Sequence, residues 1–99
     1  MPSDRFRALE SLFRKTEAAH GEYESTQLNG VYDQDWARWY ADYALDNGFG
    51  ALTGAPVSPD ELAGFFSSSW EEAQRADPPP TEPWPTQAAR RVDEMMPPP

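Results

Sequence analysis

The chain has 99 residues, and its 17 acidic against 8 basic side chains give it a net charge of −9. This length limits the fold to one domain, and the charge makes nucleic acid and anionic lipid surfaces unfavourable partners. The sequence contains no cysteine, which excludes disulfides and thiolate metal sites within it.

The first residues are polar and charged where a signal peptide would be apolar. The longest uncharged stretch, residues 47–59, is interrupted by glycine and proline and is too short to cross a bilayer. We therefore expect a cytoplasmic protein with no membrane partner.

A first helix is predicted from Ser3 or Asp4, either of which is a good N-cap, to about Thr26. Apolar residues recur along it at steps of three and four, which is typical of one buried stripe. The stripe consists of Phe6, Leu9, Phe13, Thr16, His20 and Tyr23. Gly21 lies inside this pattern, so we expect the helix to bend or end early there.

A second helix is predicted from Asp33, as its cap, to Asn47 and Gly48, where a left-handed C-terminal cap is expected. Asp35 then lies in the first turn, where an acidic group is favourable. The aromatic face of this helix consists of Trp36, Trp39, Tyr40 and Tyr43. Residues 48–57 contain three glycines and a proline and are predicted to be a connection.

A third helix begins at a capping box, with Ser58 as N-cap, Pro59 in the first position and Glu61 in the third. It should end by Ala76, because the following prolines disfavour helical geometry. Its apolar face consists of Leu62, Phe65, Phe66, Ser69, Trp70 and Ala73. The predicted fold is all-α, a small bundle of three main helices over residues 3–76.

Residues 77–99 hold eight of the eleven prolines and are predicted to be a proline-rich tail with partial order. Polyproline conformation is expected over residues 77–85, followed by a marginal helix capped by Thr86. The apolar face of that helix consists of Ala88, Val92, Met95 and Met96. Trp84, between two prolines, has three open roles: docking onto its own core, anchoring a partner, or disorder.

The only histidine, His20, lies in the apolar stripe one turn before Glu24. It is either a buried ring paired with Glu24 or Tyr23, or a metal ligand or proton carrier held by a carboxylate. His20 and Glu24 are thus the candidate catalytic residues. Asp33 and Asp35 are candidate magnesium ligands, although helix capping accounts for both. No stretch matches a cofactor signature, so none is predicted.

The aromatic residues of the second and third helices form either the core or the lining of a ligand pocket. They are Trp36, Trp39, Tyr40, Tyr43, Phe65, Phe66 and Trp70. Acidic residues beside Trp39 form either a solvated edge or a surface for an Arg or Lys side chain of a partner. The candidate partner-binding residues are Asp35, Trp39, Asp42, Asp46 and Trp84.

The run HGEYE at residues 20–24, followed by VYDQDWARWYADY at residues 31–43, resembles a group of small uncharacterised bacterial helical proteins. The resemblance implies a compact bacterial domain, and it implies no activity, cofactor or site residue.

Taken together, these patterns favour a non-enzymatic binding or accessory protein. It would present the acidic, aromatic-edged side of its second helix, and its tail, to a protein partner or to a second copy of itself. The alternative is a small-molecule-binding protein or metal-dependent enzyme that uses His20 and nearby carboxylates at an aromatic pocket.

Overall fold

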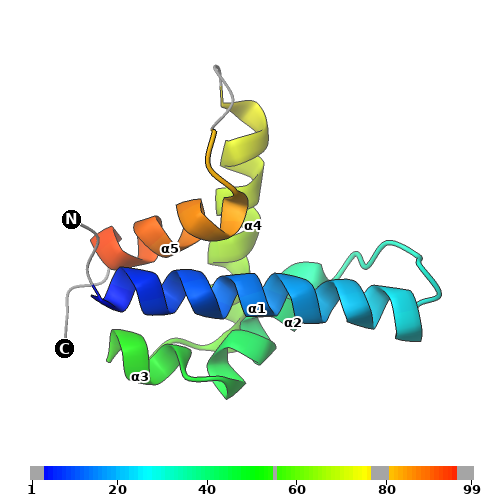
Figure 1. Cartoon of the computed structure of the whole chain (residues 1–99), viewed down its shortest axis with the longest axis horizontal. Helices are drawn as coiled ribbons and strands as arrows, with labels where there is room; N and C mark the ends of the chain where they lie inside the picture. Colours follow the sequence, from blue (N-terminus) through cyan, green and yellow to red (C-terminus); the bar gives the residue numbers. More distant parts are fainter. Residues whose placement is uncertain (1–3, 55, 77–80, 96–99) are drawn as a thin grey trace.

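The structure is a computed structural model that describes residues 4–54, 56–76 and 81–95. These residues form five α-helices and no strand (Figure 1). The helices are α1 (Asp4–Gln27), α2 (Trp36–Asp46), α3 (Phe49–Thr53), α4 (Pro59–Arg75) and α5 (Trp84–Met95). The all-α prediction is confirmed, and the count of three main helices is corrected to five.

The longest helix, α1, has the bounds expected from its stripe and runs without interruption through Gly21. The predicted bend or early end is therefore wrong. The helix buries Leu9, Phe13, Thr16 and His20 on one side. The tertiary contacts of these buried residues outweigh the cost of about 1 kcal/mol that a single glycine imposes on a helix.

Helix α5 lies antiparallel along the N-terminal half of α1 (Figure 1). Arg5 Nε donates to Asp93 Oδ1 over 2.9 Å, and Thr86 Oγ1 donates to Glu10 Oε2 over 2.7 Å. Part of the expected tail thus belongs to the core, with Ala88, Ala89 and Val92 at most 1% exposed.

Three details of the predicted tail need correction. Thr86 is not the cap of the last helix but lies inside α5, which begins two residues earlier. Trp84 and Pro85 lie in the first turn of α5 instead of in a polyproline segment, since proline is tolerated in a first helical turn. Met95, expected on the buried face, is 64% exposed. The prolines at 78–80 and 97–99 and Met96 lie outside the described residues.

Helix α2 begins three residues later than predicted, at Trp36. Asp33 is not its cap, because the N-cap position falls at Asp35. Asp33 Oδ1 accepts from the backbone N–H of Asp35 over 2.9 Å in the preceding turn. Asp35 takes the N-cap position without a capping bond from its side chain. The predicted C-terminal end is confirmed, with Gly48 in the left-handed region at φ +109°.

Helix α3 lies in the segment that was predicted to be a connection. Left-handed Gly48 and Gly54 bracket it, and Phe49 between them is fully buried against Phe13 at 6.2 Å between ring centroids. The predicted capping box of α4 is confirmed: Glu61 N–H donates to Ser58 Oγ, and Ser58 N–H donates to Glu61 Oε1, each over 3.1 Å.

Phe13, Phe49 and Phe66 form the centre of the interior, which we call the phenylalanine core. Each is at most 1% exposed, and Phe13 meets Phe66 edge to face at 5.3 Å. Trp70, which shares the predicted apolar face of Phe66, is 41% exposed and lies outside this core. Among the described residues, every helix is too short or too polar to cross a bilayer.

Candidate ligand cleft

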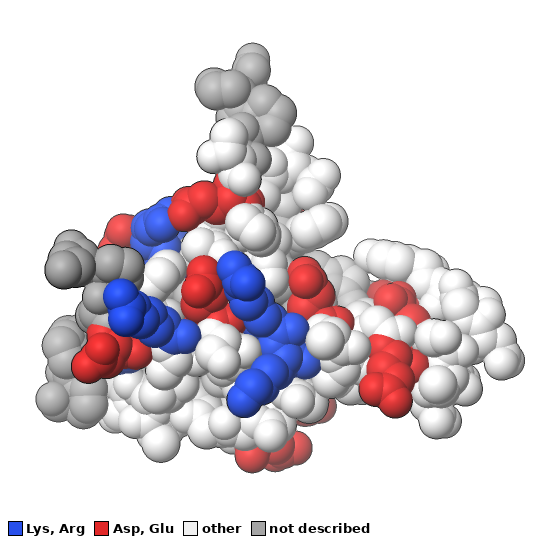
Figure 2. All heavy atoms as spheres, in the orientation of Figure 1, with Lys and Arg blue, Asp and Glu red and all other residues white. Residues whose placement is uncertain are grey.

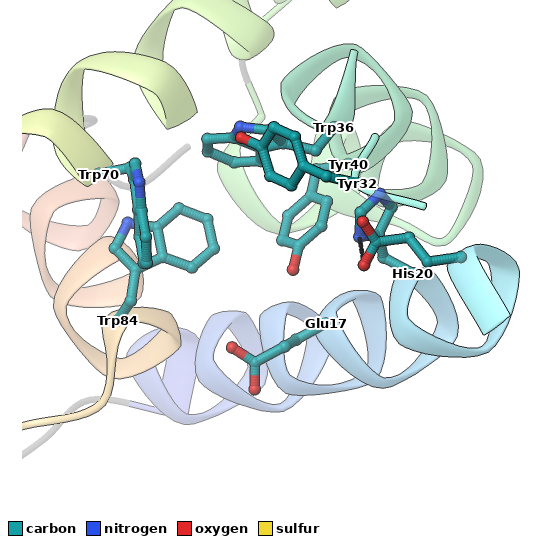
Figure 3. A pocket seen from close by; sticks show the side chains of 8 residues that line it. Glu17, His20, Tyr32, Trp36, Tyr40, Trp70 and Trp84 are labelled. Carbon is teal, nitrogen blue, oxygen red and sulfur yellow. Dashed lines mark ion pairs between the residues drawn. The ribbon is translucent and has the colours of Figure 1, made fainter. Parts of the chain in front are cut away.

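A cleft of about 250 Å³ opens where α1, α2, α4 and α5 meet (Figure 3). Each of these helices contributes side chains to it, and one more comes from the loop between α1 and α2. The lining residues are Glu17, His20, Glu24, Tyr32, Trp36, Tyr40, Trp70 and Trp84. The cleft therefore joins three tryptophans and two tyrosines to two carboxylates and the only histidine.

Three indoles line one side of the cleft, and we call Trp36, Trp70 and Trp84 the indole corner. Their ring centroids lie 5.8 to 6.1 Å apart, and their planes cross at 71° to 85°. Trp84 is fixed by its indole N–H, which donates to Ser69 Oγ over 3.2 Å. The three rings thus present steeply crossed planes to one space.

Tyr40 lies between the indole corner and the phenylalanine core. Its ring contacts Trp84 at 5.5 Å and Phe66 at 5.9 Å, and its hydroxyl points into the cleft toward the side from which Glu17 projects (Figure 3). Burial raises the pKa of this hydroxyl, and the nearby charges of Glu17 and Glu24 raise it further. The Tyr40 hydroxyl therefore keeps its proton at neutral pH.

His20 is 5% exposed and held between two carboxylates. Its Nε2 donates to Asp33 Oδ2 over 2.9 Å, since an ionised carboxylate can only accept, and its Nδ1 lies 3.7 Å from Glu24 Oε1. Glu24 Oε2 also accepts from the backbone N–H of Asp33 over 3.0 Å. The prediction of a buried, paired histidine is confirmed, with Asp33 as the closer partner instead of Glu24 or Tyr23.

These contacts fasten the loop between α1 and α2 and place Tyr32 at the cleft. The structure brings together both catalytic candidates and one of the two candidate metal ligands, and their polar groups contact one another. These residues are His20, Glu24 and Asp33. Asp35 is exposed at the start of α2. Within residues 4–54, 56–76 and 81–95, no group of three His, Asp or Glu side chains is arranged to hold a metal ion.

The acidic edge of α2, defined by Asp35, Asp42 and Asp46, is exposed as predicted. Arg38 forms an ion pair with one residue of this edge, because its Nε lies 3.3 Å from Asp42 Oδ1. A terminal nitrogen of Arg38 also lies 2.6 Å from Asp60 Oδ1 on α4. The ring of Trp39 is half-buried between Tyr23 and Tyr43, at centroid distances of 5.4 and 5.5 Å.

Trp84, the fifth candidate partner-binding residue, is only 8% exposed and docks on its own core. It is therefore not available as an anchor for a partner in this structure. Of its three open roles, docking is the one observed.

Charge is distributed unevenly along α1. The basic residues lie at positions 5 to 15, whereas the later charged positions are acidic. On the face shown in Figure 2, blue side chains lie over the N-terminal half of α1, and its C-terminal half is red and white. The cleft belongs to this acidic half, and no Lys or Arg is among its lining residues.

Glu17, Tyr32 and Trp84 are the lining residues that sequence reasoning missed as pocket components. The signal for Glu17 was present, because it lies one helical turn before His20 and so on the same side of α1. Tyr32 and Trp84 carry no such local signal, since a loop and a docked helix bring them to the cleft.

Comparisons with protein families, with curated proteins and with solved structures find no match to this chain.

Proposed function

We propose that this protein is a non-enzymatic small-molecule-binding protein whose ligand occupies the cleft between α1, α2, α4 and α5. The observation that carries the proposal is an aromatic cavity with a few polar groups directed into it, which is the usual composition of a ligand site. The net negative charge supports a protein that does not bind nucleic acid.

The engagement of His20 supports binding over catalysis. Nε2 donates to Asp33 Oδ2, so this nitrogen is not available to a bound molecule, and Nδ1 lies 3.7 Å from Glu24 Oε1. Ser69 Oγ is similarly occupied, since it donates to the Phe66 carbonyl and accepts from Trp84. The Tyr40 hydroxyl, which keeps its proton, is suited to orient a ligand.

The test is a screen of small fragments of mixed charge against the isotope-labelled protein by NMR, following the four tryptophan indole signals. Three of these indoles line the cleft, and Trp39 does not. Fragments that shift the signals of Trp36, Trp70 and Trp84 together, with Trp39 unmoved, support the proposal. A library that leaves all three unmoved contradicts it.

A protein partner at the acidic edge is a second candidate function. It is supported by the exposure of Asp35, Asp42 and Asp46 on one helix beside the partly exposed Trp39. Its weakness is that Arg38 already pairs with Asp42. The partner would carry basic side chains, because a second copy would bring its own negative charge to the same place.

This candidate is tested by capture of partners with the wild type and with a variant that replaces Asp35, Asp42 and Asp46 by Asn. A partner held by the wild type at low salt, and released by the variant and by high salt, supports the acidic edge. Equal capture by both proteins removes it.

A further inference from the structure

The charges in the cleft determine which sign of ligand it accepts. Glu17 and Glu24 are the carboxylates that line it, and His20 is flanked by Asp33 and Glu24. Both glutamates line the same cleft as Tyr40, and their charges add to the effect of burial in raising the pKa of its hydroxyl. Their negative potential therefore acts inside the cleft. An anionic ligand would be repelled from this space, and a cationic one attracted.

The chemistry of the lining narrows the type of cation. Metal ions need several oxygen or nitrogen atoms directed at one point, and the described side chains form no such group. The indole corner instead lines the cleft with three indole rings whose planes cross steeply. Ring faces attract diffuse organic cations, and tryptophan is the best of the aromatic side chains for this.

A methylated ammonium group fits these aromatic walls better than an ammonium group with free N–H bonds does. A quaternary ammonium donates no hydrogen bonds, so it needs no ring of acceptors and is satisfied by π faces and a nearby carboxylate. The cavity of about 250 Å³ is also smaller than the roughly 300–1,000 Å³ typical of sites for drug-sized ligands. It therefore suits a small head group.

We infer that the cleft binds a small organic cation with a methylated ammonium head group, seated in the indole corner with Glu17 and Glu24 as its countercharge. This inference rests on the proposed function and names the ligand class for that same cleft. Trp36, Trp70 and Trp84 supply the ring faces, and the Tyr40 hydroxyl contacts a polar end of the ligand.

The direct test compares a cation with a neutral molecule of the same shape. Choline and tetramethylammonium are titrated into the full chain, and 3,3-dimethylbutan-1-ol replaces the quaternary nitrogen of choline by carbon. Tryptophan fluorescence and calorimetry follow the binding. We expect choline to bind at least about tenfold more tightly than the neutral alcohol, because only the cation interacts with π faces and carboxylates.

Two variants test the roles of the charge and the rings. Glu17→Gln removes a cleft carboxylate at an exposed position, and Glu22→Gln is its control on the same helix. Trp70→Leu removes a ring face, whereas Trp70→Phe keeps one. We expect choline binding to weaken about threefold to tenfold in Glu17→Gln and more in Trp70→Leu, with Glu22→Gln unchanged and Trp70→Phe intermediate.

The outcomes separate this inference from the proposed function. Equal binding of choline and the neutral alcohol overturns the inference and leaves the cleft as a ligand site. No response to either molecule, together with an unresponsive fragment screen, overturns both. A trimethyllysine peptide serves as a further arm: tighter binding than choline assigns the head group to a protein side chain, and weaker binding assigns it to a free molecule.

Discussion

The phenylalanine core and the indole corner are both built from aromatic rings, but one is closed and the other opens to solvent. Phe13, Phe49 and Phe66 pack within the hydrophobic cluster of the interior and carry no polar side-chain atoms, so complete burial costs them nothing in lost hydrogen bonds. The indole corner and Tyr40 carry N–H and O–H groups and lie beside carboxylates. Ring content alone therefore does not distinguish a core from a site.

The two regions also differ in what holds them in place. The core is fixed by ring packing between α1, α3 and α4. The cleft depends on directed bonds: His20 to Asp33, Glu24 to the Asp33 backbone, and Trp84 to Ser69. Substitutions in the core should consequently affect stability, and substitutions at the cleft should affect stability less and ligand binding more.

The largest effect is expected from Phe13→Ala in the phenylalanine core. Truncation removes both ring contacts and leaves a cavity that the packed helices cannot fill, which should cost about 3–5 kcal/mol of unfolding free energy. Urea titration followed by circular dichroism measures this. Phe65→Ala is the matched control, because Phe65 is only partly buried and should lose clearly less. Equal losses would show that the two sites are packed alike.

A smaller loss of unfolding free energy is expected when the hydrogen bond between His20 and Asp33, which holds the loop between α1 and α2 against α1, is weakened. Asp33→Asn keeps the size of the side chain but removes the charge that His20 Nε2 faces, and should cost about 1–3 kcal/mol. Asp35→Asn, two residues away and exposed, should stay within about 0.5 kcal/mol of the wild type. Chemical denaturation of both variants measures the difference, and equal values would contradict a holding role for Asp33.

The raised pKa of Tyr40 predicts a loss of stability at alkaline pH. The unfolded tyrosine ionises near pH 10, and the buried one ionises higher, so its contribution is fully present below pH 10 and declines as pH rises beyond it. Because the tyrosine ionises more readily in the unfolded chain, the free energy of unfolding should fall by about 1 kcal/mol between pH 10 and pH 11. Tyr40→Phe should show a correspondingly flatter decline in melting temperature over this range. Parallel declines would mean that Tyr40 ionises as freely as an exposed tyrosine.

The smallest effect on stability is expected at the mouth of the cleft. Glu17 is exposed and acts on the cleft through its charge, so Glu17→Gln should stay within about 0.5 kcal/mol of the wild type in thermal melting. A large change in stability would mean that this carboxylate supports the fold, and its part in ligand binding would then need a separate explanation.

How far the sequence predicted the structure differs from helix to helix. The capping box of α4 specified both its start and its bonds, because that signal is contained within four residues. The start of α2 was predicted too early because aspartate is a favoured N-cap residue. In the structure the Asp33 side chain bonds to His20, 13 positions earlier, and the helix begins after Asp35. Helix α3 was missed because burial of Phe49 outweighs the loop preference of its glycines.

The sequence by itself determined the all-α class and the extent of α4, because periodicity and capping act over one or two helical turns. Only the tertiary structure decided that α5 packs on α1 and that Trp84 joins Trp36 and Trp70 to form a cleft. The physical reason is that these contacts join residues far apart in the chain. Their free energy comes from surfaces that meet only after the helices have packed.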